Sequence, residues 1–308
     1  MGKIDREFVG SFKNLELLAK EVVQGFMTGL HKSPFRGFSV EFAEHRHYNR
    51  GESTRHIDWK LYGRTDKLFI KEYEEETNLR ASFIIDASPS MFYPEKSEKQ
   101  LSKFQYSIYG AAVLMELLQR QRDAFALNLF DRELYFDSEM KSTPAHKQFL
   151  FSQLESELNK TKEKQQGTDL VNILHQKAET LPARSLVVIF TDFFVGGWKE
   201  ELWEAFRHLA HKNHDMVVFH VNDRRSEHDL ELNTQWARII DAETGEEIKL
   251  NPEQYQKSYR EKISEQNLKI KTELLNLRTD YYVVDIQDDF ENLMRAYLSR
   301  RKKILQSR

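Results

Sequence analysis

The feature that most constrains this chain is a continuous apolar run, LVVIFT at residues 186–191, which ends directly at Asp192. Most of its residues are β-branched, and no polar residue interrupts the apolar ones. Strands of this kind are typically buried on both faces of a sheet. Further strand-like runs are found at residues 82–85, 125–130, 216–221 and 281–284.

Apolar residues at helical spacing separate these runs. Leu101, Phe104 and Ile108 recur at steps of three and four, and Leu202, Phe206 and Leu209 do the same later in the chain. Strands that alternate with helices indicate a mostly parallel sheet with helices on both faces. We therefore predict a doubly wound α/β domain over residues 81–308.

The first 80 residues have a different pattern. Phe8, Phe12, Leu15 and Ala19 begin an amphipathic helix, residues 33–65 are polar and rich in arginine, and residues 68–73 resemble a short strand. We predict that residues 1–80 form a helical and β-stranded extension packed on the sheet. Limited proteolysis that releases a stable fragment from about residue 81 would contradict this.

Composition excludes several classes of protein. There are 46 basic and 49 acidic residues and a net charge of −3, so we expect no nucleic-acid binding. The chain has no cysteine, which excludes disulfides, thiolate zinc sites and cysteine nucleophiles. No apolar stretch approaches the roughly 18 residues of a membrane span, and the first residues lack a secretory signal pattern. We expect a cytoplasmic protein without a membrane span.

Five oxygen-bearing residues follow the predicted strands or open a helix. Asp86, Ser88 and Ser90 form the pattern Asp-x-Ser-x-Ser after one strand, Asp192 follows another, and Thr168 stands at a helix start. The carboxyl ends of parallel strands share one edge of a sheet, where ligands bind. Carboxylates and hydroxyls are hard donors that suit Mg²⁺, or Mn²⁺. We predict a divalent metal site with a position open to an outside carboxylate.

This set resembles the metal-ion-dependent adhesion site of von Willebrand factor A domains. A second resemblance, to the bacterial family called domain of unknown function 58, extends over nearly the whole chain. It is carried by Arg36-Gly37, Glu41-Phe42, Arg46-x-Tyr48, Gly51, Arg55-x-Ile57-Asp58-Trp59, Lys71-Glu72-x-Glu74-Glu75-Glu76 and the late hairpin Asp241–Glu246. One departure is Pro89, which removes a backbone N–H from the loop that contains Asp86, Ser88 and Ser90.

The resemblance implies a von Willebrand factor A-like fold and a role as an adaptor of a MoxR-type AAA ATPase. It also implies a protein partner that offers an acidic residue to the metal. We therefore expect a non-enzymatic binding module.

Two other functions remain open at this stage. The first is a Mg²⁺-dependent phosphohydrolase on a similar sheet, although Ser88 stands where such enzymes need an acid. The second is a scaffold without metal, in which Asp86 caps a helix and Ser88 and Ser90 are turn residues. Phosphate release abolished by Asp86→Asn would favour the enzyme, whereas partner binding that survives Asp86→Ala would favour the scaffold.

Overall fold

The computed structural model divides the chain into two compact units. One comprises Met1–Phe26 and Leu79–Arg308, and the other comprises Met27–Asn78. The predicted segment 1–80 is thus divided between the two units at Phe26. The structure describes Val9 and residues 14–31, 45–47, 59–71, 79–94, 100–159, 168–194, 200–232, 234–240 and 245–306.

The smaller unit contains a two-stranded antiparallel ladder and one short helix. β1 (His45–His47) pairs with β2 (Phe69–Lys71), and α3 (Trp59–Thr65) lies between them in the sequence. Trp59 contacts Tyr62 edge-to-face within α3. Most of the motifs behind the family resemblance lie outside the described residues, namely those at residues 36–44, 48–58, 72–76 and 241–244.

The larger unit is built on a six-stranded sheet with the order β10-β7-β6-β3-β4-β5. Five of the strands are parallel, and β5 runs antiparallel to β4 at one edge. The predicted doubly wound, mostly parallel sheet is confirmed. The strands are β3 (Arg80–Asp86), β4 (Ala124–Phe130), β5 (Leu134–Asp137), β6 (Leu186–Thr191), β7 (Asp215–Asn222) and β10 (Asp280–Asp285).

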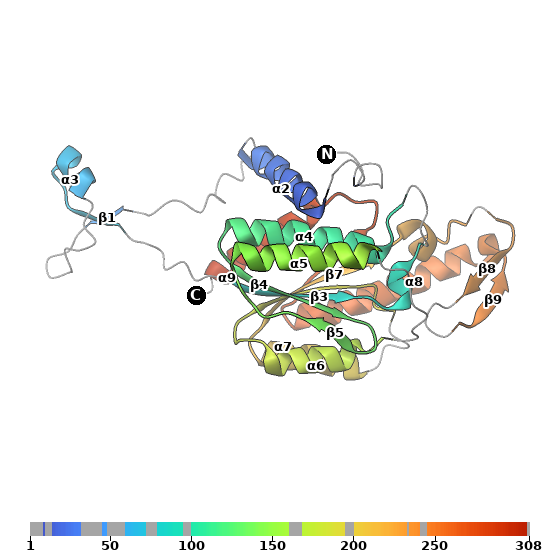
Figure 1. Cartoon of the computed structure of the whole chain (residues 1–308). Coiled ribbons are helices and arrows are strands. Elements are labelled where there is room, and N and C mark those ends of the chain that lie inside the picture. The colour runs from blue at the N-terminus through green and yellow to red at the C-terminus, as the bar shows by residue number, and fades with distance from the viewer. Residues whose placement is uncertain are drawn as a thin grey trace. The chain divides into compact units, whose positions relative to one another are not determined.

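Helices cover both faces of this sheet (Figure 1). On one face lie α4 (Lys103–Arg120), α5 (Pro144–Asn159) and α9 (Glu291–Gln306). The other face has α6 (Leu170–Thr180), α7 (Glu200–His211) and α8 (Pro252–Asn276), which share one apolar core. These two layers bury β3 and β6 almost completely, as their unbroken apolar runs predict.

The predicted N-terminal helix is α2 (Leu15–His31), whose residues up to Phe26 belong to the larger unit. Leu15, Leu18 and Val22 are buried there. The backbone N–H of Leu15 donates to Glu155 of α5 at 2.9 Å. The helical part of the predicted extension therefore packs against the sheet domain.

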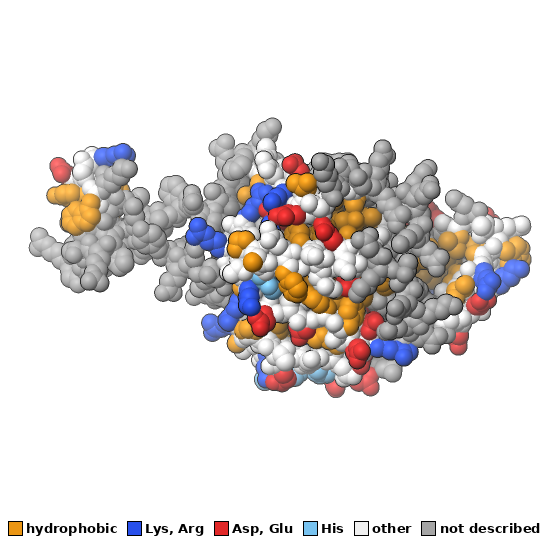
Figure 2. Space-filling model, in the orientation of Figure 1, with side chains coloured by type: hydrophobic (Ala, Val, Ile, Leu, Met, Phe, Trp, Pro, Cys, Tyr) orange, Lys and Arg blue, Asp and Glu red, His pale blue; other side chains and the backbone are white. Residues whose placement is uncertain are grey.

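After β7 the chain forms a single π-helical turn, η3 (Arg224–His228), and then an antiparallel hairpin of β8 (Ala237–Ile240) and β9 (Glu247–Leu250). Ile240 and Ile248 of this hairpin are more than half exposed, at 52% and 58%. Figure 2 shows the hairpin at the right-hand end of the larger unit, with apolar and charged side chains mixed on its surface. Among the described helices, none combines the length and the apolar character needed to cross a membrane.

Candidate metal site

The candidate site lies where the strand order changes direction. β3 is first in the sequence among the six strands, and its neighbours on the two sides are β4 and β6. The chain builds outward from this point in both directions, so the ends of β3 and β6 form the switch point at which α/β sheets bind ligands. Asp86 is the last residue of β3, and Asp192 directly follows β6.

The loop after β3 turns its polar groups toward Asp86. Asp86 Oδ1 accepts the backbone N–H of Ser88 at 2.9 Å, and Oδ2 accepts the Thr191 hydroxyl at 2.7 Å. The hydroxyls of Ser88 and Ser90 lie 3.2 Å apart, and all of these side chains are buried. Pro89 begins the short 3₁₀ helix η2 (Pro89–Phe92), where its missing N–H is not needed.

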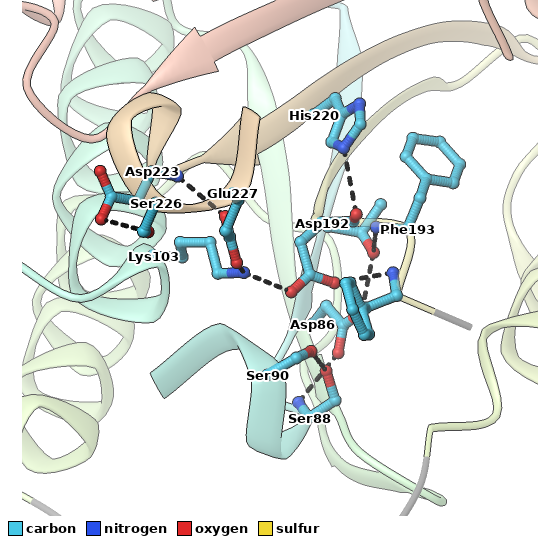
Figure 3. A network of polar contacts seen from close by, with 12 residues as sticks. Asp86, Ser88, Ser90, Lys103, Asp192, Phe193, His220, Asp223, Ser226 and Glu227 are labelled. Atoms are coloured by element: carbon cyan, nitrogen blue, oxygen red, sulfur yellow. Dashed lines mark hydrogen bonds and ion pairs between the residues drawn. The ribbon is translucent and has the colours of Figure 1, made fainter. Parts of the chain in front are cut away.

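Asp192 joins this loop from the side of β6. Its Oδ1 accepts the backbone N–H of Phe194 at 2.9 Å, and its Oδ2 accepts Lys103 Nζ at 2.7 Å (Figure 3). A hydrogen bond from Ser90 also helps to lower the pKa of Asp192. Four of the five predicted site residues therefore form one connected cluster: Asp86, Ser88, Ser90 and Asp192.

The backbone next to Asp192 is held in an unusual shape. Phe193 has a φ of 54°, in the left-handed region that side chains other than glycine rarely adopt. His220 Nε2 lies 3.0 Å from the Asp192 carbonyl, and its Nδ1 lies 2.6 Å from the Tyr281 hydroxyl. Burial lowers the pKa of His220 to about 4, so the neutral ring donates from Nε2 and accepts from Tyr281. The hydrogen bond from His220 to the Asp192 carbonyl therefore holds the direction of the backbone after β6.

Sequence reasoning missed Lys103 and Glu227. Lys103 is the first residue of α4 and contacts both Asp192 and Glu227 of η3. The second Glu227 oxygen accepts the backbone N–H of Asp223 at 2.9 Å. The one available signal was a lysine at a helix start with no acidic residue in the first turn, which the helix dipole disfavours.

Charge is distributed unevenly over the cluster. Burial, and then the charge of Asp192, raise the pKa of Asp86 to about 7. Burial also opposes ionisation of Asp192, but the charge and hydrogen bond of Lys103, together with hydrogen bonds from Phe194 and Ser90, lower its pKa. Asp192 is thus compensated by a cation of the protein, whereas Asp86 contacts neutral donors.

Thr168 lies at the same edge of the sheet but is not joined to the other four residues. The backbone N–H of the next residue, Asp169, donates to Asp131 just beyond β4 at 3.0 Å. Asp169 then caps α6 by accepting the N–H of Asn172. Within the part of the chain that the structure describes, the buried Thr168 hydroxyl has no hydrogen-bond partner. An unpaired buried hydroxyl is costly and suits a missing ligand.

Comparison with known proteins identifies the family. The family model described as Protein of unknown function DUF58 matches residues 44–273, which is more than half of the chain. The chain belongs to this family. Uncharacterized proteins of Mycobacterium tuberculosis and Mycobacterium bovis are each 26% identical to it over 87 residues, or 28% of this chain. The matched stretch spans 27% of the length of these curated relatives.

Solved structures match this chain only at low sequence identity. BatB from Bacteroides thetaiotaomicron is 14% identical, with a TM-score of 0.44 over 73% of this chain and 99% of its own. A von Willebrand factor type A protein from Catenulispora acidiphila is 15% identical, with a TM-score of 0.33 over 46% of this chain and 33% of its own.

The donor set of this DUF58-family chain fits a hard divalent cation. Among the described residues, no three His, Cys, Asp or Glu side chains lie together in a group that could hold a metal ion. The candidate site instead combines two carboxylates with hydroxyls, of which Thr168 is unpaired. Such an oxygen set suits Mg²⁺ or Mn²⁺ and not softer ions.

Proposed function

We propose that this DUF58-family chain is a non-enzymatic, metal-dependent protein-binding module. The observation that supports it is the connected cluster of Asp86, Ser88, Ser90 and Asp192 at the switch point of the sheet. The Thr168 hydroxyl, which has no hydrogen-bond partner among the described residues, lies at the same edge. These five residues would hold Mg²⁺, or Mn²⁺, directly or through water. The bound ion would offer an open coordination position to an acidic residue of a partner protein.

The resemblance to the DUF58 family suggests the class of partner. We propose a MoxR-type AAA ATPase, for which this chain acts as an adaptor. Co-purification of the two proteins in Mg²⁺, and its loss with Asp86→Ala, is the expected result. Co-purification that Asp86→Ala leaves unchanged would favour a scaffold that needs no metal.

A phosphohydrolase is less well supported by the site. Such enzymes place an acid two residues after the nucleophilic aspartate, to protonate the leaving group. Here that residue is Ser88, whose hydroxyl lies 3.2 Å from the Ser90 hydroxyl. We expect no phosphate release from a generic ester in Mg²⁺, and turnover that Asp86→Asn abolishes would overturn the proposal.

The first test is calorimetric titration of the metal-stripped protein with Mg²⁺ and Mn²⁺. We expect one saturable site in the wild type that Asp86→Ala removes. Equal heats for wild type and variant would show that binding occurs elsewhere and would contradict the proposed site.

A further inference from the structure

Lys103 occupies a position that its own helix disfavours. It is the first residue of α4, directly after the N-cap Ser102, and no acidic side chain is present in that first turn. The N-terminal end of a helix carries partial positive charge and stabilises anions, not cations. The side chain of Lys103 is nevertheless fully buried, with 0% exposed.

Two carboxylates from distant parts of the chain hold this ammonium in place. Nζ donates to Asp192 Oδ2 at 2.7 Å and also contacts Glu227 (Figure 3). Buried ion pairs generally add little stability over apolar packing, because both charges lose their hydration. Stability alone therefore gives a weak reason for this arrangement.

The position of Lys103 determines which carboxylate a metal ion can use. Both oxygens of Asp192 already accept hydrogen bonds, one from Phe194 and one from Lys103. A divalent ion would share Asp192 with an ammonium group in direct contact with it. Asp86 instead accepts from the Ser88 backbone and the Thr191 hydroxyl, both neutral. Both carboxylates therefore accept hydrogen bonds on both oxygens, and they differ in that only Asp192 contacts a cation. Asp86 is the carboxylate that a metal ion would approach without an ammonium group in direct contact.

We propose that Lys103 is a built-in competitor for Asp192 that sets how tightly the site holds its divalent ion. This inference rests on the proposed metal-dependent function. By compensating Asp192, Lys103 keeps the ion weakly bound in the free protein. The acidic residue of the partner then supplies the missing negative charge, so that metal and partner bind together. Glu227 is a positioning residue, because its carboxylate shares the ammonium group with Asp192.

The experiment is a calorimetric titration of the full-length, metal-stripped chain with Mn²⁺. We expect Lys103→Met to bind Mn²⁺ at least about tenfold more tightly than the wild type, since a neighbouring positive charge is lost. Glu227→Gln should bind about threefold more weakly, since Lys103 is then held by Asp192 alone. A purely structural role would weaken binding in both variants, whereas competition predicts opposite directions.

Lys147→Met is the matched control. Lys147 is also a buried lysine between two carboxylates, Glu16 and Glu116, but it contacts none of the proposed ligands. Its replacement should leave the Mn²⁺ affinity unchanged. Lys103→Arg, which keeps the charge, should bind Mn²⁺ like the wild type.

A second variant and a second readout keep the test informative if Lys103→Met fails to fold. Lys103→Gln keeps a donor for Asp192 without the charge, and Mn²⁺ should raise its melting temperature more than that of the wild type. If Lys103→Met and Lys103→Gln fold but bind no more tightly, the competitor role is wrong while the metal site stands. If neither they nor the wild type bind Mn²⁺, the proposed function itself is wrong. Binding by the variants alone would support competition strongly.

Discussion

Two buried lysines, Lys103 of α4 and Lys147 of α5, each contact two carboxylates. The two clusters that they form carry the same formal charge and lie near opposite ends of α4. The strand-end cluster consists of Lys103, Asp192 and Glu227. The helix cluster consists of Lys147, Glu116 and Glu16. Lys103 and Glu116 lie thirteen residues apart on α4, so the clusters are separated by roughly 20 Å along the helix axis.

The clusters differ in the elements that supply them. In the helix cluster Lys147 of α5 donates to Glu16 of α2 at 2.9 Å and to Glu116 of α4 at 3.0 Å, and its ammonium lies over the Phe151 ring. This cluster therefore fastens three helices together. In the strand-end cluster the carboxylates follow β6 and β7, beside the hydroxyls of the loop after β3.

The exposure of the clusters differs mainly at the lysine. The Lys103 and Asp192 side chains are 0% and 2% exposed, against 9% and 5% for Lys147 and Glu116, and the third residue is partly exposed in both clusters, Glu227 at 23% and Glu16 at 29%. A charge that water can reach contributes little to stability, whereas a charge sealed from water strongly affects every neighbouring charge. The same three charges hold three helices together in the helix cluster and, as we propose, control ion binding in the strand-end cluster.

The largest expected effect is on stability without metal. Lys103→Met should lower the free energy of unfolding by about 3–5 kcal/mol, because it leaves the enclosed Asp192 and the partly exposed Glu227 uncompensated. Lys147→Met should lower it by about 1–3 kcal/mol, because water partly solvates Glu16. Urea unfolding of both variants measures the difference. Added Mn²⁺ should restore stability to Lys103→Met alone, and equal recovery of both variants would break the comparison.

The next effect concerns the metal affinity. Asp86→Ala should weaken Mn²⁺ binding at least about a hundredfold, because even the partners of metal ligands are worth 10–100-fold and a charged ligand is worth more. Glu116→Ala removes a buried carboxylate of the helix cluster and should leave the affinity unchanged. Calorimetry on the two variants checks both statements. Loss of binding in Glu116→Ala would show that the carboxylates act through global stability.

Thr168→Val should weaken Mn²⁺ binding about five- to tenfold, an effect of about 1 kcal/mol. Valine has nearly the shape of threonine, and the hydroxyl it removes has no hydrogen-bond partner among the described residues. The free energy of unfolding without metal should therefore stay equal or rise slightly. Thr168→Ser keeps the hydroxyl and serves as the control. Unchanged affinity in Thr168→Val would remove this residue from the site.

The smallest effect is expected at the edge of the helix cluster. Glu16→Gln should lower the free energy of unfolding by about 0.5–1 kcal/mol, since Lys147 keeps its ion pair with Glu116. The loss should shrink in about 1 M salt, where exposed charges are screened. Urea unfolding at low and high salt checks this. A loss of stability that persists in high salt would show that the charge of Glu16 is shielded from solvent.

Much of the fold could be predicted because buried strands and helices show patterns of apolar residues in the local sequence. The runs at residues 82–85 and 186–191 are unbroken because helices cover both faces of β3 and β6. Their last positions placed Asp86 and Asp192 at one edge. The hydroxyls of Ser88 and Ser90 follow within the same loop, so short-range spacing was enough to group them.

The remaining contacts depend on the strand order, which no local pattern specifies. Lys103 meets Asp192 and Glu227 across separations of 89 and 124 residues, and Thr191, which looked like an ordinary strand residue, donates to Asp86 across 105. The sequence by itself determined the alternation of strands and helices and the oxygen donors at the strand ends, because hydrophobic periodicity acts over neighbouring residues. Only the tertiary structure decided that an ammonium group lies against one of those donors, because that contact requires β6 to pair with β3, the strand that precedes α4.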